Sequence, residues 1–123
     1  MEMQEYQSFT NSIALYPGQG TVAGLTYTIL GLVGEAGELA NKVKKVLRDH
    51  EGVMSEPMRD SMAVELGDVL WYVSQVAMEL DIALDTIAGM NIYKLKLRKK
   101  TGTLQGDGDK REMIERRDLD FPY

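Results

Sequence analysis

The sequence contains no cysteine, a single histidine and only three prolines among 123 residues. Without cysteine, disulfide bonds, thiolate metal sites and cysteine nucleophiles are excluded. The solitary His50 argues against a di-iron helix bundle, which needs a histidine beside each carboxylate pair, and we expect it at the surface. No apolar run approaches the roughly 20 residues of a membrane span, and the N-terminus lacks a signal-peptide pattern. We therefore expect a cytoplasmic protein.

The sequence also has fewer basic than acidic residues. The chain has 14 lysines and arginines against 19 acidic residues, a net charge of -5. This balance argues against a broad nucleic-acid surface or a membrane surface as partner. A chain of this length is expected to form one domain with its own core.

Helical periodicity dominates the chain, and alternation typical of β-strands is never sustained. Apolar residues spaced alternately three and four apart predict one long helix from Val22 to Val46 and a second from Met58 to Leu80. A shorter helix is expected over residues 3–15, and a further one through Ile87 to about Lys100, with Asp81 or Asp85 as its N-cap. We predict an all-α antiparallel helix bundle over residues 1–101 and a glycine-containing loop or tail over residues 102–123.

Two acidic pairs in matching frames are the most informative feature. Glu35 and Glu38 form one pair, and Glu65 and Asp68 form the other. Residues three apart share one face of a helix, so the carboxylates of each pair repel each other. Each pair also encloses a glycine, which costs about 1 kcal/mol relative to alanine in a helix interior. The pattern predicts a cation held between two helices by four carboxylates, with Mg²⁺ as the cofactor and Mn²⁺ as a substitute.

Polar side chains continue at helical spacing from these pairs. On the three long helices they are Lys42 and Lys45, then Tyr72, Gln75 and Glu79, then Asn91, Lys94 and Arg98. Carboxylates with cations nearby suit a metal-bound polyphosphate. Solvated helix faces with ordinary ion pairs are the alternative for Lys42, Lys45 and Glu79, and Trp71 is open to both core packing and base stacking.

Residues 34–39, 65–72 and 91–98, in this order, resemble the MazG-like family of all-α nucleoside triphosphate pyrophosphohydrolases. These are relatives of dimeric dUTPases and of phosphoribosyl-ATP pyrophosphohydrolase. The resemblance covers roughly residues 25–100. It implies that Mg²⁺ binds Glu35, Glu38, Glu65 and Asp68, that Lys94 and Arg98 contact phosphates, and that Asn91 and Tyr72 lie near the sugar or base. It also implies a homodimer or homotetramer.

The expected reaction is hydrolysis of a nucleoside triphosphate to a nucleoside monophosphate and pyrophosphate. No nucleophile has a partner base, so metal-activated water is the attacking group, with Glu38 or Glu35 orienting it or accepting its proton. Deoxynucleotides or non-standard nucleotides are the expected substrates, in a role of nucleotide-pool sanitation. The base is not specified by the sequence.

Further substrate contacts are expected from Lys45 and from the tail. Residues 102–111, with three glycines, are predicted to fold over the bound nucleotide, so that Lys110 or Arg111 touches phosphate or base. A tail used in oligomer packing is the alternative. For the chain as a whole, a non-catalytic regulatory module that binds metal and nucleotide, or a phosphoribosyl-ATP pyrophosphohydrolase, remains open. The intact spacing of all four acids favours an enzyme.

Overall fold

A computed structural model describes residues 1–105, which form four helices and no strand. The helices are α1 (Met3–Ser12), α2 (Val22–Asp49), α3 (Glu56–Glu79) and α4 (Leu84–Thr101). The prediction of an all-α chain is confirmed. No helix in the described part is both long and apolar enough to span a membrane. The rest of the predicted tail beyond residue 105, with its expected nucleotide contacts, lies outside the described residues.

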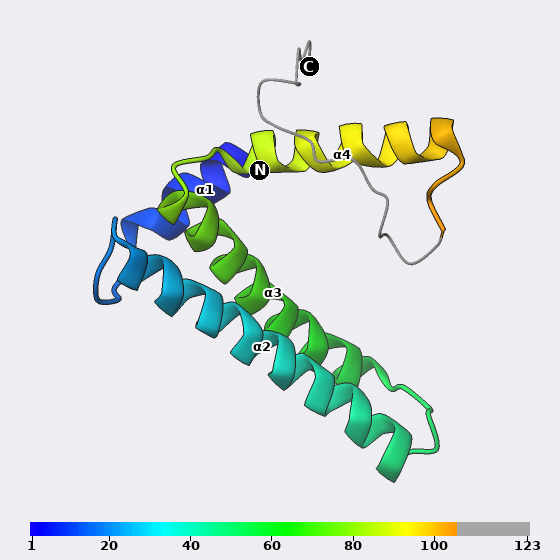
Figure 1. The fold of residues 1–123 in the computed structure, drawn as a ribbon. Coiled ribbons are helices and arrows are strands. Elements are labelled where there is room, and N and C mark those ends of the chain that lie inside the picture. Colours follow the sequence, from blue (N-terminus) through cyan, green and yellow to red (C-terminus); the bar gives the residue numbers. More distant parts are fainter. Residues whose placement is uncertain (106–123) are drawn as a thin grey trace.

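The long helices α2 and α3 form an antiparallel hairpin, which is the most extensive helix pair of the chain (Figure 1). Helix α1 packs against α3 at the open end of the hairpin, near the start of α2. Helix α4 contacts α1 and α3, and then extends away from the hairpin (Figure 1). The described part of one chain is therefore an antiparallel hairpin with two appended helices.

The start of α4 depends on a residue far away in the sequence. Its N-cap is Ala83, so the predicted caps Asp81 and Asp85 are wrong. Instead, the Leu84 backbone N–H donates to the side-chain oxygen of Gln7 in α1 at 2.9 Å, and the Gln7 amide donates to the Ile82 carbonyl at 3.1 Å. A buried side chain from α1 thus satisfies groups that a local cap would otherwise satisfy.

The other helix ends follow local rules more closely. α1 ends at Ser12, three residues earlier than predicted. α3 begins at Glu56 with Pro57 in its first turn, where no intrahelical N–H bond is lost. Gly102 ends α4 in the left-handed conformation (φ 71°), and the next amide donates back to the Arg98 carbonyl at 2.8 Å.

Glycine and polar side chains lie along the line of contact between α2 and α3, together with half-buried leucines of α2. The facing pairs along it are Gly24 with Glu79, Gly31 with Tyr72, and Lys42 with Ser61. In each pair the two residue numbers sum to 103, so the pairs describe one continuous antiparallel register. By this register, Glu35 lies opposite Asp68, and Glu38 lies opposite Glu65.

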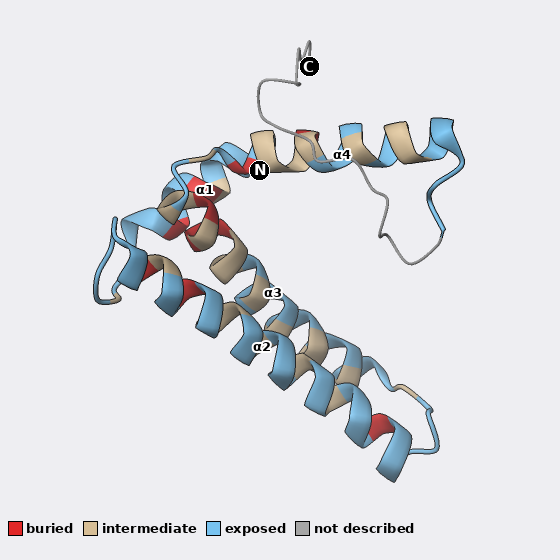
Figure 2. Cartoon of the chain, viewed as in Figure 1, coloured by how far each residue is buried: buried red, intermediate tan, exposed pale blue. Residues whose placement is uncertain are grey.

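The apolar stripes of the two helices are consequently only half covered. On α2, Leu25, Leu32, Leu39 and Val46 are buried or half-buried, whereas Val22, Ile29, Ala36 and Val43 are exposed. Of the hydrophobic residues in the described part, only Val46, Ala77 and Leu84 are fully buried (Figure 2). Within residues 1–105, the hairpin therefore covers one side of the α2 stripe and leaves the other side exposed.

Candidate functional site

Three of the four motif carboxylates meet midway along the α2–α3 hairpin. One carboxylate oxygen each from Glu35, Glu65 and Asp68 lies within 4.8 Å of the other two. Glu35 and Glu65 are half-buried and Asp68 is exposed. Helical spacing places Glu65 and Asp68 on one face of α3, and the hairpin register brings Glu35 to them.

The electrostatics of this acidic group fit a divalent cation. Burial raises the pKa of Glu35, and the negative charges of Asp68, Glu65 and Glu38 raise it further. The group therefore carries more negative charge than its protein surroundings neutralise. Carboxylate oxygens are the donors that Mg²⁺ and Mn²⁺ prefer, so the donor set suits either ion.

Glu38 is not part of the three-oxygen group. It is exposed, and within residues 1–105 it makes no hydrogen bond or ion pair, although its charge reaches Glu35. The structure therefore brings together three of the four predicted metal ligands. The role of Glu38 as a metal ligand or as the group that orients water stays a prediction.

A lysine neutralises part of the acidic group. The Lys42 ammonium lies 3.1 Å from Glu65 Oε1 and donates a hydrogen bond to Ser61 Oγ at 2.5 Å. The Lys42 side chain is 31% exposed and that of Glu65 is 20% exposed, so the ion pair is partly shielded from water. Of the two interpretations that the sequence left open for Lys42, this contact agrees with a helix face that carries ordinary ion pairs, and a contact with phosphate stays a prediction.

An aromatic cluster adjoins the acidic group on the side toward α1. Tyr72 packs against Gly31 and lies edge-on to Trp71, with ring centroids 4.9 Å apart. Trp71 is also edge-on to Tyr16, which stacks on Tyr27. Burial, then the charges of Tyr27, Glu35 and Asp68, raise the pKa of Tyr72. Tyr72 is thus placed next to the carboxylates, while the contacts of Trp71 are those of packing.

Tyr6 is a site neighbour that the sequence did not reveal. Burial and the charge of Asp68 raise the pKa of its hydroxyl. Its only signal in the sequence is a place on the apolar side of the first helix. No rule of spacing links residue 6 to residue 68, since the proximity comes from the packing of α1 on α3.

Glu79, on the polar stripe of α3, is used to hold a loop. It accepts a hydrogen bond from the Tyr16 hydroxyl at 2.6 Å and another from the Gly20 backbone N–H at 2.9 Å. Burial and this hydrogen bond raise the pKa of Tyr16. Both carboxylate oxygens of Glu79 are therefore committed to the turn between α1 and α2.

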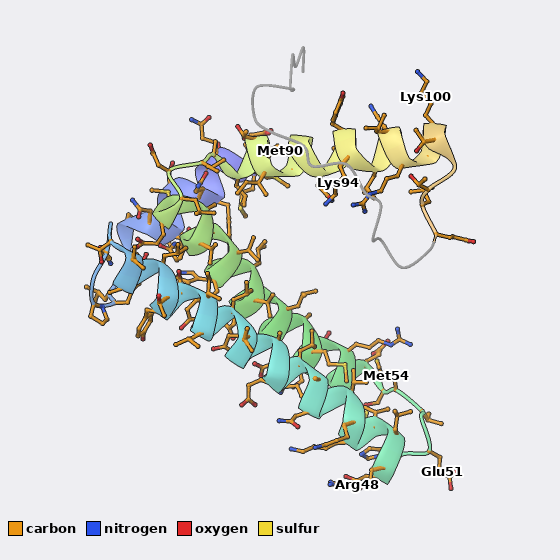
Figure 3. All side chains as sticks on the ribbon, in the orientation of Figure 1. Arg48, Glu51, Met54, Met90, Lys94 and Lys100 are labelled. Carbon is orange, nitrogen blue, oxygen red and sulfur yellow. The ribbon has the colours of Figure 1, made fainter. Side chains whose placement is uncertain are left out.

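The predicted phosphate-binding residues on α4 do not adjoin the acidic group within one chain. Asn91, Lys94 and Arg98 lie on a helix that extends away from the hairpin, as the position of Lys94 illustrates (Figure 3). Their contact with a phosphate at this site would require α4 of another copy. Lys110 and Arg111 lie outside the described residues.

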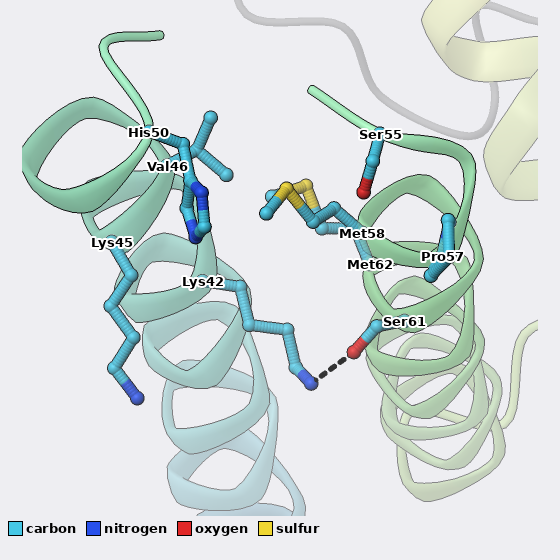
Figure 4. Close-up of a pocket in the computed structure, with 9 residues that line it drawn as sticks. All are labelled: Lys42, Lys45, Val46, His50, Ser55, Pro57, Met58, Ser61 and Met62. Carbon is cyan, nitrogen blue, oxygen red and sulfur yellow. Dashed lines mark hydrogen bonds between the residues drawn. The ribbon is translucent and has the colours of Figure 1, made fainter. Parts of the chain in front are cut away.

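A pocket of about 400 Å³ opens between the end of α2 and the start of α3 (Figure 4). It is lined by Lys42, Lys45, Val46, His50, Ser55, Pro57, Met58, Ser61 and Met62. Lys42 reaches across it from α2 to Ser61 on α3 (Figure 4). The predicted substrate-binding residue Lys45 lines this pocket, and His50 does so as well. The sequence alone does not predict this pocket, because it forms only where α2 and α3 pack against each other.

Comparison with known proteins shows the family of the chain. The profile of the MazG nucleotide pyrophosphohydrolase domain matches residues 24–103, a range that includes the acidic group, the pocket and all of α4. The Gene 37 protein of Mycobacterium phage L5 is 50% identical over 114 residues, which span 90% of this chain and the whole of that protein. No solved structure matches the chain. The chain therefore belongs to the MazG nucleotide pyrophosphohydrolase family.

Proposed function

We propose that this protein hydrolyses nucleoside triphosphates to nucleoside monophosphate and pyrophosphate in the presence of Mg²⁺. Deoxynucleoside triphosphates or non-standard nucleotides are the substrates we expect, which suits a role in nucleotide-pool sanitation. The convergence of the Glu35, Glu65 and Asp68 oxygens within 4.8 Å, inside the range matched by the family, carries the proposal. Mn²⁺ is expected to replace Mg²⁺, because both ions accept carboxylate oxygens.

In this mechanism, water attacks one of the two phosphorus atoms joined by the oxygen bridge between the α- and β-phosphates. The bond from that phosphorus to the bridging oxygen breaks, and its electron pair stays on the oxygen. A bound metal ion supplies Lewis acidity and lowers the pKa of water. Glu38 then orients the water and accepts its proton, since it is exposed, adjacent to the group and uninvolved in other polar contacts within residues 1–105. Glu35 is the second candidate, because its raised pKa makes it a better proton acceptor than an ordinary glutamate.

The site is completed, in this proposal, by a second copy of the chain in a homodimer or homotetramer. Large apolar residues remain exposed along α2 and α3, including Val33 (65%), Val64 (65%) and Leu66 (55%). Large apolar residues left exposed on two helices support an interface with another copy. Asn91, Lys94 and Arg98 on the projecting α4 would then approach the phosphates of the neighbouring copy, while Tyr72 remains near the sugar or base.

The test is a panel of nucleoside triphosphates with Mg²⁺, scored separately for pyrophosphate and for phosphate. Wild-type protein should release pyrophosphate, and Glu65→Gln and Asp68→Asn should lower kcat/KM by at least about 100-fold, as expected for losing a metal ligand. Glu51→Gln, in the exposed α2–α3 loop, is the matched control and should retain activity.

Four outcomes would contradict the proposal. Release of phosphate and a diphosphate would exclude a pyrophosphohydrolase. Activity undiminished by EDTA would exclude the metal mechanism. Metal and nucleotide binding without turnover would favour a regulatory module, and cleavage of phosphoribosyl-ATP alone would favour that narrower enzyme.

A further inference from the structure

The pocket between α2 and α3 and the acidic group share one residue, Lys42. Its ammonium binds Glu65 on one side, and its side chain lines the pocket on the other (Figure 4). It therefore stands between the carboxylates that suit a cation and the pocket beside them. No sequence motif or family match assigns it a role.

The charged side chains that line the pocket are all basic. In a chain of net charge -5, its nine lining residues include two lysines and a histidine and no carboxylate. The hydroxyls of Ser55 and Ser61 add hydrogen-bond donors at the same place. An anion meets no like charge on these walls, whereas a cation would be repelled by two ammonium groups.

Lys42 is held in its present position by two contacts. The 3.1 Å ion pair to Glu65 sets its charge against the acidic group, and the hydrogen bond to Ser61 fixes its direction across the pocket. A divalent cation on Glu65 would compete directly with this ion pair, since both require the same carboxylate. Once displaced, the ammonium has the pocket as its nearest polar surroundings.

We propose that Lys42 is a two-position residue that occupies Glu65 until a metal ion displaces it and then binds the pyrophosphate end of the substrate in the adjoining pocket. This inference rests on the proposed function, which supplies the polyphosphate substrate. It orders the substrate along the hairpin, with the pyrophosphate end toward Lys42 and Lys45 and the nucleoside end toward Tyr72. It also makes anion binding depend on prior neutralisation of Glu65.

The first test measures pyrophosphate binding by calorimetry in metal-free buffer. Glu65→Gln mimics the neutralisation that a metal ion would bring and should tighten binding at least about tenfold, the effect of one added charge-assisted hydrogen bond. Glu38→Gln removes the same charge nearby without touching Lys42, and it should tighten binding less than about threefold. Adding Lys42→Met to Glu65→Gln should abolish the gain, whereas adding Lys44→Met, on the same helix but outside the pocket, should keep it.

The second test measures Mn²⁺ binding by electron paramagnetic resonance in the absence of nucleotide. Lys42→Met should bind Mn²⁺ about threefold more tightly than Lys44→Met, because a partly exposed ion pair of this size no longer competes. Circular dichroism should give wild-type helicity for every variant used.

The proposal is overturned if Glu65→Gln binds pyrophosphate no more tightly than Glu38→Gln, if the gain survives Lys42→Met, or if the two lysine variants bind Mn²⁺ equally. These outcomes leave the proposed hydrolase untouched. Absence of turnover with every nucleotide would instead refute the hydrolase, while the binding measurements would still decide the role of Lys42.

Discussion

Replacing Gly31 with alanine is the sharpest probe of how the hairpin is assembled. A Cβ atom at this position would overlap the ring of Tyr72, reaching Cδ1, Cε1 and Cζ. The ring is also held by its edge-on contact with Trp71, so it cannot retreat at no cost. Overpacking of this kind costs about 1–3 kcal/mol, offset by about 1 kcal/mol from the higher helix propensity of alanine.

Gly34→Ala is the matched control on the same helix. A Cβ there meets nothing within 4 Å in the described part of the chain, so only the propensity gain applies. The two variants should therefore differ by the whole overpacking cost of about 1–3 kcal/mol. For a chain of this length that is a difference in Tm of roughly 4–12 °C, with Gly31→Ala the lower.

Thermal unfolding followed by circular dichroism in EDTA measures this difference. Equal melting temperatures for the two variants would refute the packing of Tyr72 on Gly31, and with it the register that joins the acidic pairs. Destabilisation by Gly34→Ala accompanied by a smaller sedimentation coefficient would show that a second copy approaches Gly34, in agreement with the proposed oligomer.

Further predictions concern stability and its dependence on ligands and pH. Tyr16→Phe should lower the free energy of unfolding by about 1.5–3 kcal/mol, because it removes a hydrogen bond to the Glu79 carboxylate. The pKa of Tyr16 is raised in the folded state, so above a pH of about 10 its hydroxyl ionises in the unfolded chain before it does in the folded one. The free energy of unfolding of the wild type should therefore fall as pH rises above about 10, and this fall should be smaller in Tyr16→Phe. Gln75→Met should raise the midpoint of urea unfolding, with a gain of about 1 kcal/mol, because neither polar atom of this buried amide has a hydrogen-bond partner within residues 1–105. An unchanged or lower midpoint would contradict this account. Saturating Mg²⁺ should raise the Tm of wild-type protein by mass action and leave that of Glu65→Gln nearly unchanged, as measured by differential scanning calorimetry.

Much of the fold followed from local rules in the sequence. The three-four spacing of apolar residues predicted the two long helices, because 3.6 residues per turn relates spacing directly to the face of a helix. The same geometry placed Glu65 beside Asp68 before any tertiary contact was known. The helix caps were less predictable: α4 is capped by the side chain of Gln7, from a different helix, and no local pattern encodes such a contact.

The sequence by itself determined the helices, the sharing of a face by each acidic pair, and the family to which these motifs belong. Tertiary structure decided which groups meet, because contact between helices depends on register and direction rather than on spacing. The register marked by Gly31 and Tyr72 brings Glu35 to Glu65 and Asp68, whereas the exposed Glu38 is not part of this three-oxygen group. The same register sets Lys42 on Glu65 and opens a pocket beside it. The direction of α4 decided where the predicted phosphate-binding residues lie. Because α4 extends away from the hairpin, Lys94 and Arg98 lie apart from the acidic residues within one chain, although the order of the sequence motifs groups them together.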